Sequence, residues 1–475
     1  MKLVCGTSFM MYGYDAGVLG GVLLHQPFID AIGLENTGQY TIPMISSAYS
    51  LAAFVTSVVL GFFSLRLGRR GTILLGNGAA ILGSVIQASA YSIAQLTVGR
   101  IITGFAIGCI SSAVPIYLAE TGVDSGDRGP AHAVNAIMLI SGVPLAYWID
   151  YGFTKMNNQI SWRGPVIFQV LLAGVAGGCM LFLPDTPRWY YARNRIAEGD
   201  AILARLHDAP SPDDPDVQRT KQEILVVIEA EMEASASLHW KQFITMGLTD
   251  RSPLKIARRL CICFWLPFIR EWMGSSLMAY YSAIILVNTG ATPTLISMLA
   301  GVQNIIFALG CVPLYFTIER TGRRSTLLYG AMFMTLLIVI FITLVAVPQT
   351  GAVRWASIAI LWFFLFVMGY AYQGGAATSA GEWLGTWLTV FVGPIGFDNS
   401  GWHFWFWVLS GNLVAVAFVF FLCPETGGKT LEQVDSLFAS GGILAGLSKD
   451  PYNEEHWVET SAEKQPQTDS TTEVK

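Results

Sequence analysis

The sequence predicts an all-α membrane protein built from two bundles of six helices each. Three observations support this fold class. The composition is 53% hydrophobic and 13% charged, with a mean hydropathy of +0.50, whereas soluble proteins carry about 25% charged residues. Twelve apolar runs are long enough to cross a bilayer at about 1.5 Å per residue. Short sequence motifs of the first half of the chain also recur in the second half.

The twelve predicted spans are expected to be helical, because lipid cannot satisfy free backbone hydrogen-bonding groups. Their expected limits are residues 3–24, 41–65, 71–91, 95–119, 131–152, 164–183, 259–288, 294–318, 325–347, 353–373, 375–397 and 402–423. Residues 1–183 and 259–423 are therefore the predicted N-terminal and C-terminal bundles. Residues 184–258 are expected to form a cytoplasmic loop with short helices, and residues 424–475 a partly disordered cytoplasmic tail.

Basic residues gather on one side of the predicted membrane. Clusters of arginine follow the second, sixth and eighth spans and Arg128 follows the fourth, while the opposite loops hold only Lys155, Arg163 and Arg354. The positive-inside rule then places both termini in the cytoplasm. We expect an integral, multi-pass protein of the plasma membrane.

Other functional classes find no support in the sequence. The net charge of −5 does not favour nucleic-acid binding. The seven cysteines lie within or beside apolar runs, where they resemble small buried hydrophobic residues more than a disulfide framework or a zinc site. No phosphate-binding loop, H-E-x-x-H motif or Ser-His-Asp arrangement is visible. We expect no enzyme activity, no metal and no cofactor.

An internal repeat relates the two halves. Residues 66–70 (R-L-G-R-R) recur as residues 320–324 (R-T-G-R-R), and residues 184–186 (P-D-T) recur as residues 424–426 (P-E-T). Each pair follows either the second or the last span of a six-span half. Two parallel halves that flank a central pathway are a known plan for transporters.

The first span carries an acid, Asp15, near its middle. A carboxylate at that depth costs roughly 2.5–3.5 kcal/mol on insertion scales, so Asp15 is not expected to face lipid. Glycines at positions 13, 17, 20 and 21 permit close packing of neighbouring helices. An acid in such an interior suits a proton-coupled transporter. The alternative is that Asp15 only pairs with a buried arginine and holds the bundle together.

Seven motifs in order carry a family resemblance. They are residues 13–18 (G-Y-D-A-G-V), Gly99-Arg100 with P-x-Y-x-x-E at 115–120, Arg128-Gly129, and residues 147–152 (Y-W-I-D-Y-G), 184–189 (P-D-T-P-R-W), 319–324 (E-R-T-G-R-R) and 424–432 (P-E-T-G-G-K-T-L-E). Over about residues 5–440 the chain resembles the sugar porter branch of the major facilitator superfamily, particularly its fungal members. The resemblance implies the major facilitator fold and alternating access, in which two halves rock about a central site.

The resemblance implies two charged systems. Proton-coupled members use an aspartate matching Asp15, paired with an arginine matching Arg100. A cytoplasmic lattice of salt bridges locks the outward-facing state, and its members here are Arg69, Glu120, Arg128, Arg188, Glu319, Arg323 and Glu425. For Arg66 and Arg320, ordinary positive-inside topology is an equal alternative. Leu65 stands where the family has an aspartate, which weakens the expected lock.

The expected substrate site departs from the family pattern. The family's seventh span reads Q-Q-x-x-G-x-N before two tyrosines, and its amides bind sugar hydroxyls, but residues 270–276 here read R-E-W-M-G-S-S. The residues expected to line the site are Arg270, Glu271, Ser276, Tyr280, Glu382 and Trp383. Carboxylates only accept hydrogen bonds and a guanidinium only donates them, so a sugar, a polyol or a charged solute could bind. Alternatively, Arg270 and Glu271 pair with each other and bind nothing.

The tenth and eleventh predicted spans meet without a connecting loop. The chain takes 116 residues from Gly68 to Pro184 but 102 from Gly322 to Pro424. Antiparallel helices need a few connecting residues, and the family has about twenty more residues between Gln373 and Gly374, including an E-I-x-P-x-R-x-R motif. The helix-ten region is therefore expected to be truncated, either by an incomplete gene model or in a real, degenerate transporter.

Together these features predict a secondary active transporter that moves a sugar or polyol by proton symport. The proton gradient is expected to drive transport, and no cofactor is expected. The expected partners are the solute and the lipid bilayer, and no oligomer is required. Two alternatives remain open. One is a transporter-like nutrient sensor that binds a solute without moving it. The other is a non-functional product of an incomplete gene model.

Overall fold

The computed structural model describes residues 1–425, except for residues 24, 36, 123–124, 154, 157, 237–255, 288–292, 349 and 374–379. Regular secondary structure in these ranges is entirely helical. Eight described stretches are long and apolar enough to cross a membrane, and one of them, Ala380–Leu422, contains two consecutive helices. The all-α membrane fold class is thereby confirmed.

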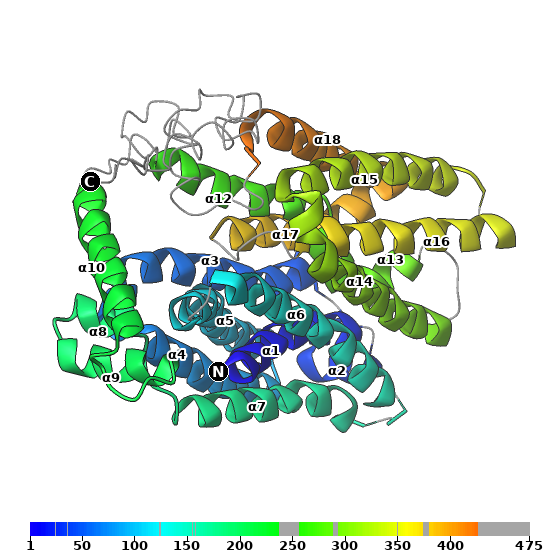
Figure 1. Cartoon of the computed structure of the whole chain (residues 1–475). Coiled ribbons are helices and arrows are strands. Elements are labelled where there is room, and N and C mark those ends of the chain that lie inside the picture. Colours follow the sequence, from blue (N-terminus) through cyan, green and yellow to red (C-terminus); the bar gives the residue numbers. More distant parts are fainter. Residues whose placement is uncertain are drawn as a thin grey trace, which may run out of the picture.

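The first half of the chain supplies six long helices, which Figure 1 shows in colours from blue through cyan to blue-green. They are α1 (Lys2–Val22), α3 (Thr41–Leu67), α4 (Arg69–Ala88), α5 (Ile93–Thr121), α6 (Ser125–Phe153) and α7 (Ile160–Met180), with the short α2 (Gln26–Ile32) following α1. The pairs α1–α6, α4–α5, α3–α5 and α4–α7 are in extensive contact. These six helices correspond one to one with the first six predicted spans.

The second half supplies α12 (Ile256–Trp272), α13 (Ser275–Val287), α14 (Pro293–Thr321), α15 (Arg323–Ala346), α16 (Gly351–Met368), α17 (Ala380–Ser400) and α18 (Trp405–Leu422). A π-helical turn, η1 (Gly369–Gln373), continues α16, and a 3₁₀ turn, η2 (Gly401–Phe404), precedes α18. Three helices lie between the halves in the sequence, the short α8 (Pro187–Ala192) and α9 (Ile196–Leu206) and the longer α10 (Pro215–Ala236), and they lie together at one end of the molecule (Figure 1).

Glycine allows helices within each half to approach closely. A Cβ atom on Gly13 would lie 1.7 Å from the carbonyl oxygen of Leu139, so α1 and α6 touch through their backbones. In the second half, a Cβ atom on Gly381 would lie 1.8 Å from the carbonyl oxygen of Phe264, which joins α17 to α12 in the same way. Small residues at such crossings are typical of helix packing in membranes.

The internal repeat recurs in three dimensions. Gly68 and Gly322 both have φ of +78° and precede α4 and α15. In the first half, Asp185 Oδ1 accepts a hydrogen bond from the Arg69 backbone N–H, at 3.1 Å. In the second half, Glu425 accepts from the backbone N–H groups of residues 323, 324 and 325. Each acid therefore satisfies free donors at a helix N-terminus, where negative charge is favoured.

The seventh predicted span, residues 259–288, is broken into two helices in the structure. α12 ends at Trp272, Gly274 adopts φ of +104°, and α13 begins at Ser275. The expectation of one continuous span was wrong here, because Gly274 takes a left-handed conformation that turns the chain. The break brings the N-terminus of α13 next to Glu271.

Among the described residues, the most extensive contacts between the two halves are those of α3 with α17, α6 with α14, and α1 with α13. Figure 1 shows α17 lying beside α3 along the boundary between the two sets of helices. Two groups of charged residues described below, Asp15 with Arg100 and Arg270 with Glu271 and Glu382, lie on α1, α5, α12 and α17.

Candidate functional site

Asp15 and Arg100 form a fully buried ion pair inside the first half. Arg100 Nη1 on α5 donates to Asp15 Oδ1 on α1 at 3.2 Å, and both side chains have 0% exposure. The sequence expectation that Asp15 avoids lipid agrees with this position. Burying an ionised acid without its cation would be strongly unfavourable, which explains why the arginine is present.

The Asp15–Arg100 pair is incompletely hydrogen-bonded. Asp15 Oδ2 and Arg100 Nε and Nη2 have no hydrogen-bond partner among the described residues. The Arg100 guanidinium lies over the ring of Tyr49, 4.7 Å from its centre, as in a cation–π contact. Because one carboxyl oxygen is unoccupied, Asp15 can accept a proton without first losing its contact with Arg100.

A second charged cluster lies in the other half. Arg270 on α12 donates to Glu271 Oε1 through Nε at 2.9 Å and to Glu382 Oε1 through Nη2 at 2.6 Å. Arg270 and Glu382 are 2% exposed and Glu271 is 1% exposed. The sequence left open whether Arg270 and Glu271 pair only with each other. The structure adds Glu382, so one arginine is shared by two carboxylates.

Glu271 and Glu382 have different surroundings. Glu271 Oε2 accepts from the Ser276 backbone N–H at 3.0 Å and also from the Ser276 hydroxyl, which is 3.1 Å from the Thr386 hydroxyl. Both Glu271 oxygens therefore have donors, one of them from the first turn of α13. Glu382 Oε1 accepts two bonds, whereas its Oε2 is buried with no hydrogen-bond partner in the described part of the chain.

Two contacts join the second cluster to the first half. The Tyr12 hydroxyl on α1 donates to Glu382 Oε1 at 3.0 Å, and Trp383 Nε1 donates to Ser111 Oγ on α5 at 3.0 Å. The Trp383 ring also packs against Tyr12 and Tyr49, with centroids 5.0 Å and 5.8 Å away. Glu382 and Trp383 thus tie α17 to α1 and α5, in addition to the packing of α17 against α3.

Tyr280, on α13, lies between the two charged systems. It is 4% exposed and is close enough to Arg100 and Asp15 on one side, and to Glu271 on the other, to experience their charges. All six residues that the sequence placed in the substrate site are buried, and they gather on α12, α13 and α17.

Tyr12, Tyr49 and Ser111 were not predicted from the sequence. Tyr12 precedes Asp15 by three residues, so helical spacing places both on one face of α1. That spacing could have identified Tyr12. Tyr49 and Ser111 lie on α3 and α5 in apolar runs, and their partners are distant in sequence, so no local pattern marks them.

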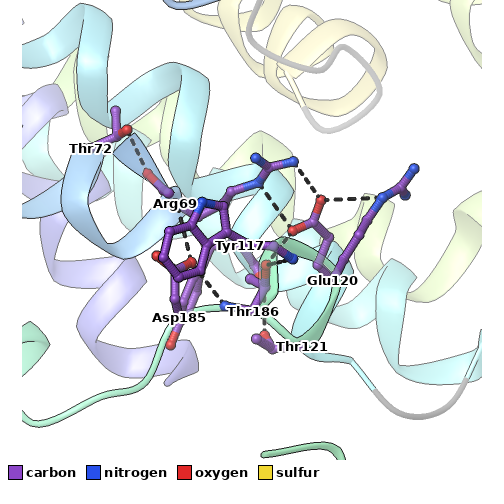
Figure 2. Close-up of polar contacts among 10 residues, drawn as sticks. Arg69, Thr72, Tyr117, Glu120, Thr121, Asp185 and Thr186 are labelled. Carbon is purple, nitrogen blue, oxygen red and sulfur yellow. Dashed lines mark hydrogen bonds and ion pairs between the residues drawn. The ribbon is translucent and has the colours of Figure 1, made fainter. Parts of the chain in front are cut away.

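A polar cluster, whose residues Figure 2 draws, links the start of α4, the end of α5 and the segment that leads into α8. Arg69 Nη2 lies 2.9 Å from Glu120 Oε1, and Arg188 Nε lies 3.9 Å from the same oxygen. The Thr186 hydroxyl donates to Glu120 Oε2 at 2.6 Å. The structure therefore brings Arg69, Glu120 and Arg188 together within the first half.

The other members of the expected lattice, Arg128 in the first half and Glu319, Arg323 and Glu425 in the second, are only partly described. Arg323 and Glu425 meet through the Arg323 backbone N–H, at 2.9 Å. The side chains of Arg128 and Glu319 fall outside the residues whose side chains the structure describes. The junction after Gln373 and nearly all of the tail also lie outside the described ranges.

Known proteins share this sequence pattern over most of its length. The model of the family described as "Sugar (and other) transporter" matches residues 2–378 and 372–438. The chain is 29% identical over 479 residues to the MFS-type transporter oryC of Aspergillus oryzae, covering 95% of this chain and 87% of the relative. It is 26% identical over 462 residues to the sugar transporter STL1 of Saccharomyces cerevisiae, covering 91% and 80%.

Solved structures show the same fold. The proton:xylose symporter XylE bound to 6-bromo-6-deoxy-D-glucose has a TM-score of 0.73 at 17% identity, covering 92% of this chain and 98% of that chain. An inward-open conformation of XylE from E. coli has a TM-score of 0.70 at 18% identity, with the same coverage. The two matches of the family model overlap at residues 372–378, which include the junction where the sequence predicts a truncation.

Proposed function

The chain belongs to the sugar (and other) transporter family, and we propose that it is a secondary transporter that moves a sugar or polyol by alternating access, with symport of a proton carried by Asp15. The observation that carries the proposal is the fully buried Asp15–Arg100 pair with one unoccupied carboxyl oxygen. The relatives named above are transporters, and none is named as an enzyme.

Proton binding and the position of the two halves are linked through the charges around Asp15. Contact with Arg100 favours the ionised acid, and loss of that contact in a dry interior favours the protonated acid. Asp15 and Arg100 both lie in the first half, and Tyr280 on α13 of the second half is close enough to experience their charges. A movement of the second half that displaces Tyr280, or that shifts α1 against α5, would change how readily Asp15 holds a proton. This supports coupling of proton binding to conformation.

We also propose that the solute is held between the halves by the cluster around Arg270 and Glu382. Aromatic faces on Tyr12, Tyr49 and Trp383 suit contact with sugar carbons, and the buried charged groups suit hydrogen bonds to hydroxyls. The distribution of arginine supports cytoplasmic termini, and we place the protein in the plasma membrane.

The test is uptake of labelled hexoses and of labelled glycerol by cells that express the protein. We expect accumulation that a protonophore abolishes, and Asp15→Asn should abolish accumulation while leaving the amount of protein in the membrane unchanged. Asp30→Asn, at an exposed position on α2, is the matched control and should accumulate solute normally. Undiminished accumulation by Asp15→Asn would refute the assignment. Binding of solute without any uptake would favour the nutrient sensor.

A further inference from the structure

One face of α3 carries a row of buried hydroxyl groups. Tyr49 and Ser50 follow Ser46 by three and four residues, which places all three on the same side of the helix. Tyr49 and Ser50 are 0% exposed and Ser46 is 1% exposed. Their hydroxyl oxygens have no hydrogen-bond partner among the described residues. Ser57, two turns beyond Ser50 on this face and only partly buried, also has an unpartnered hydroxyl in that part of the chain.

Other hydroxyl groups on α3 are satisfied by the helix itself. Ser47 Oγ donates to the Met44 carbonyl oxygen at 3.4 Å, and Thr56 Oγ1 donates to the Ala52 carbonyl oxygen at 2.8 Å. Such bonds to the preceding turn are available to any serine or threonine in a helix. Because buried polar groups are normally hydrogen-bonded, an unpartnered row on one face indicates a place where another molecule supplies the partners.

The row faces the second half of the chain, next to the cluster that we propose as the solute site. The ring of Tyr49 packs against Trp383 on α17, with centroids 5.8 Å apart. Ser50 lies beside Tyr280 on α13. The helices α3 and α17 are themselves in extensive contact. Hydroxyl groups of the first half therefore stand opposite aromatic side chains of the second half.

Ser46 extends the row by one turn toward the start of α3. It lies beside Tyr281, whose hydroxyl donates to the Val390 carbonyl oxygen at 3.0 Å and so has no hydrogen to give to Ser46. Ser46 and Ser50 are separated by about 6 Å along the helix axis, at 1.5 Å per residue. The hydroxyl groups of one small solute can span that distance.

The chemistry of the row suits the hydroxyl groups of a neutral solute. A hydroxyl both donates and accepts hydrogen bonds, and residues 41–60 contain no Asp, Glu, Lys or Arg that would pair with a charged solute. We propose that Ser46, Tyr49 and Ser50 form a subsite that binds hydroxyl groups of a neutral polyhydroxy solute. This inference rests on the proposed function, because it extends the same solute site into the first half.

Binding of solutes to the purified full-length protein in detergent tests the subsite. The probes are D-glucose, D-xylose, myo-inositol and glycerol, and affinity is read from the rise of the thermal unfolding midpoint with probe concentration. We expect at least one probe to bind. Ser46→Ala, Tyr49→Phe and Ser50→Ala should each weaken that binding about 2- to 10-fold, since each loses one hydrogen bond. Ser47→Ala, which removes a buried hydroxyl bonded to its own helix, is the matched control and should bind as the wild type does.

Deoxy analogues of the bound probe separate direct contact from other roles. Where an analogue lacks the hydroxyl that a side chain contacts, the wild type and the variant of that side chain should bind it equally. A loss of affinity by the same factor for every analogue would show that the side chain acts only on the shape of the protein, and would overturn the subsite. Binding of wild-type strength by all three variants, or no binding of any neutral probe, would also overturn it.

The ligand-free proteins give a second measurement. Removal of a buried hydroxyl that has no partner breaks no hydrogen bond, so the three variants should unfold at or above the wild-type midpoint. A clearly lower midpoint, or a variant that does not fold, would show that the hydroxyls have structural partners and would contradict the inference. Neither measurement requires uptake or a proton gradient, so their failure is distinguishable from failure of the proposed function.

Discussion

At the scale of single residues, the position of Asp15 depends on glycines that bring α1 against α6. Gly13 touches the backbone of Leu139, and Gly17, on the next turn, touches the backbone of Val143. This packing fixes α1 against α6, in the position from which Asp15 contacts Arg100. The position of Asp15 and the close contact of Gly13 and Gly17 with α6 therefore depend on each other.

Gly13→Ala is expected to destabilise the protein. The added Cβ atom would lie 1.7 Å from the Leu139 carbonyl oxygen, so α1 and α6 would have to separate. Overpacking of this kind costs about 1–3 kcal/mol or more. The measurement is the thermal unfolding midpoint in detergent. Gly78→Ala is the control, because nothing lies within 4 Å of its Cβ position on α4. A midpoint for Gly13→Ala that equals or exceeds that of Gly78→Ala would contradict the account.

The sequence was informative about which charged residues matter and less so about how they connect. Asp15 stands out because it is an acid inside an apolar run, and the resemblance supplied its pairing with Arg100. Arg270, Glu271 and Glu382 stand out because they replace amides of the family pattern. The sharing of Arg270 by two acids depends on the packing of α12 against α17, which are more than one hundred residues apart, so no local pattern could show it. Their roles in proton and solute binding stay predictions.

At the scale of helices and loops, acids capping α4 and α15 reproduce the repeat seen in the sequence. Asp185 and Glu425 occupy equivalent positions after the last helix of each half. Arg70 and Arg324 complete the correspondence, since their Nη2 atoms donate to the carbonyl oxygens of Leu181 and Phe420. The N-terminus of one helix is thus tied to the C-terminal end of another in both halves.

Asp185 should give the protein a measurable pH dependence. Burial raises the pKa of Asp185 above 3.8, and this effect outweighs the backbone N–H bonds from Thr186, Arg70 and Arg69 that lower it. Because the folded pKa lies above the unfolded one, the stability contributed by protonated Asp185 is fully present below about pH 3.8 and is lost as pH rises through the folded pKa.

The comparison of wild type with Asp185→Asn isolates this effect. Asparagine keeps an acceptor oxygen for the α4 backbone but does not titrate. We expect the unfolding midpoint of wild type, relative to that of the variant, to fall as pH increases from about 3.8 toward neutrality. The measurement is the midpoint of thermal unfolding in detergent at a series of pH values. A difference that stays constant, or rises with pH, would show that burial does not dominate at this site.

At the scale of the whole molecule, the two halves are similar in plan and unequal in detail. In the first half, Arg69 pairs with Glu120 near the end of the fourth long helix, α5. The second half has no aspartate or glutamate between Glu319 and Glu382. An acid equivalent to Glu120, near the end of the tenth span, is therefore missing. The end of the tenth span, where this acid is missing, is also where the two matches of the family model overlap, at residues 372–378.

The spans could be predicted from the sequence because long apolar runs and the positive-inside pattern are strong signals. The break at Gly274 was missed, because a single glycine in an apolar run does not reveal its backbone conformation. The junction at residues 374–379 lies outside the described ranges. Its prediction rests on the spacing of repeated motifs.

Sequencing of the transcript across the codons of Gln373 and Gly374 tests the truncation. If the gene model is incomplete, about twenty codons should appear there, restoring a loop between helices that now have few connecting residues. These codons should include an acid and the basic residues of a cytoplasmic loop. An uninterrupted transcript would instead establish a shortened second half, and the incomplete gene model would be rejected.

Solute-driven proton movement in proteoliposomes tests the central claim most directly. Purified protein is reconstituted with a pH-sensitive dye inside the vesicles, and an inward gradient of a hexose or of glycerol is applied without a pH gradient. We predict acidification of the interior that follows solute entry in the wild-type protein, and solute entry without acidification in Asp15→Asn. Solute entry with no acidification in the wild-type protein, or equal acidification in Asp15→Asn, would contradict the account.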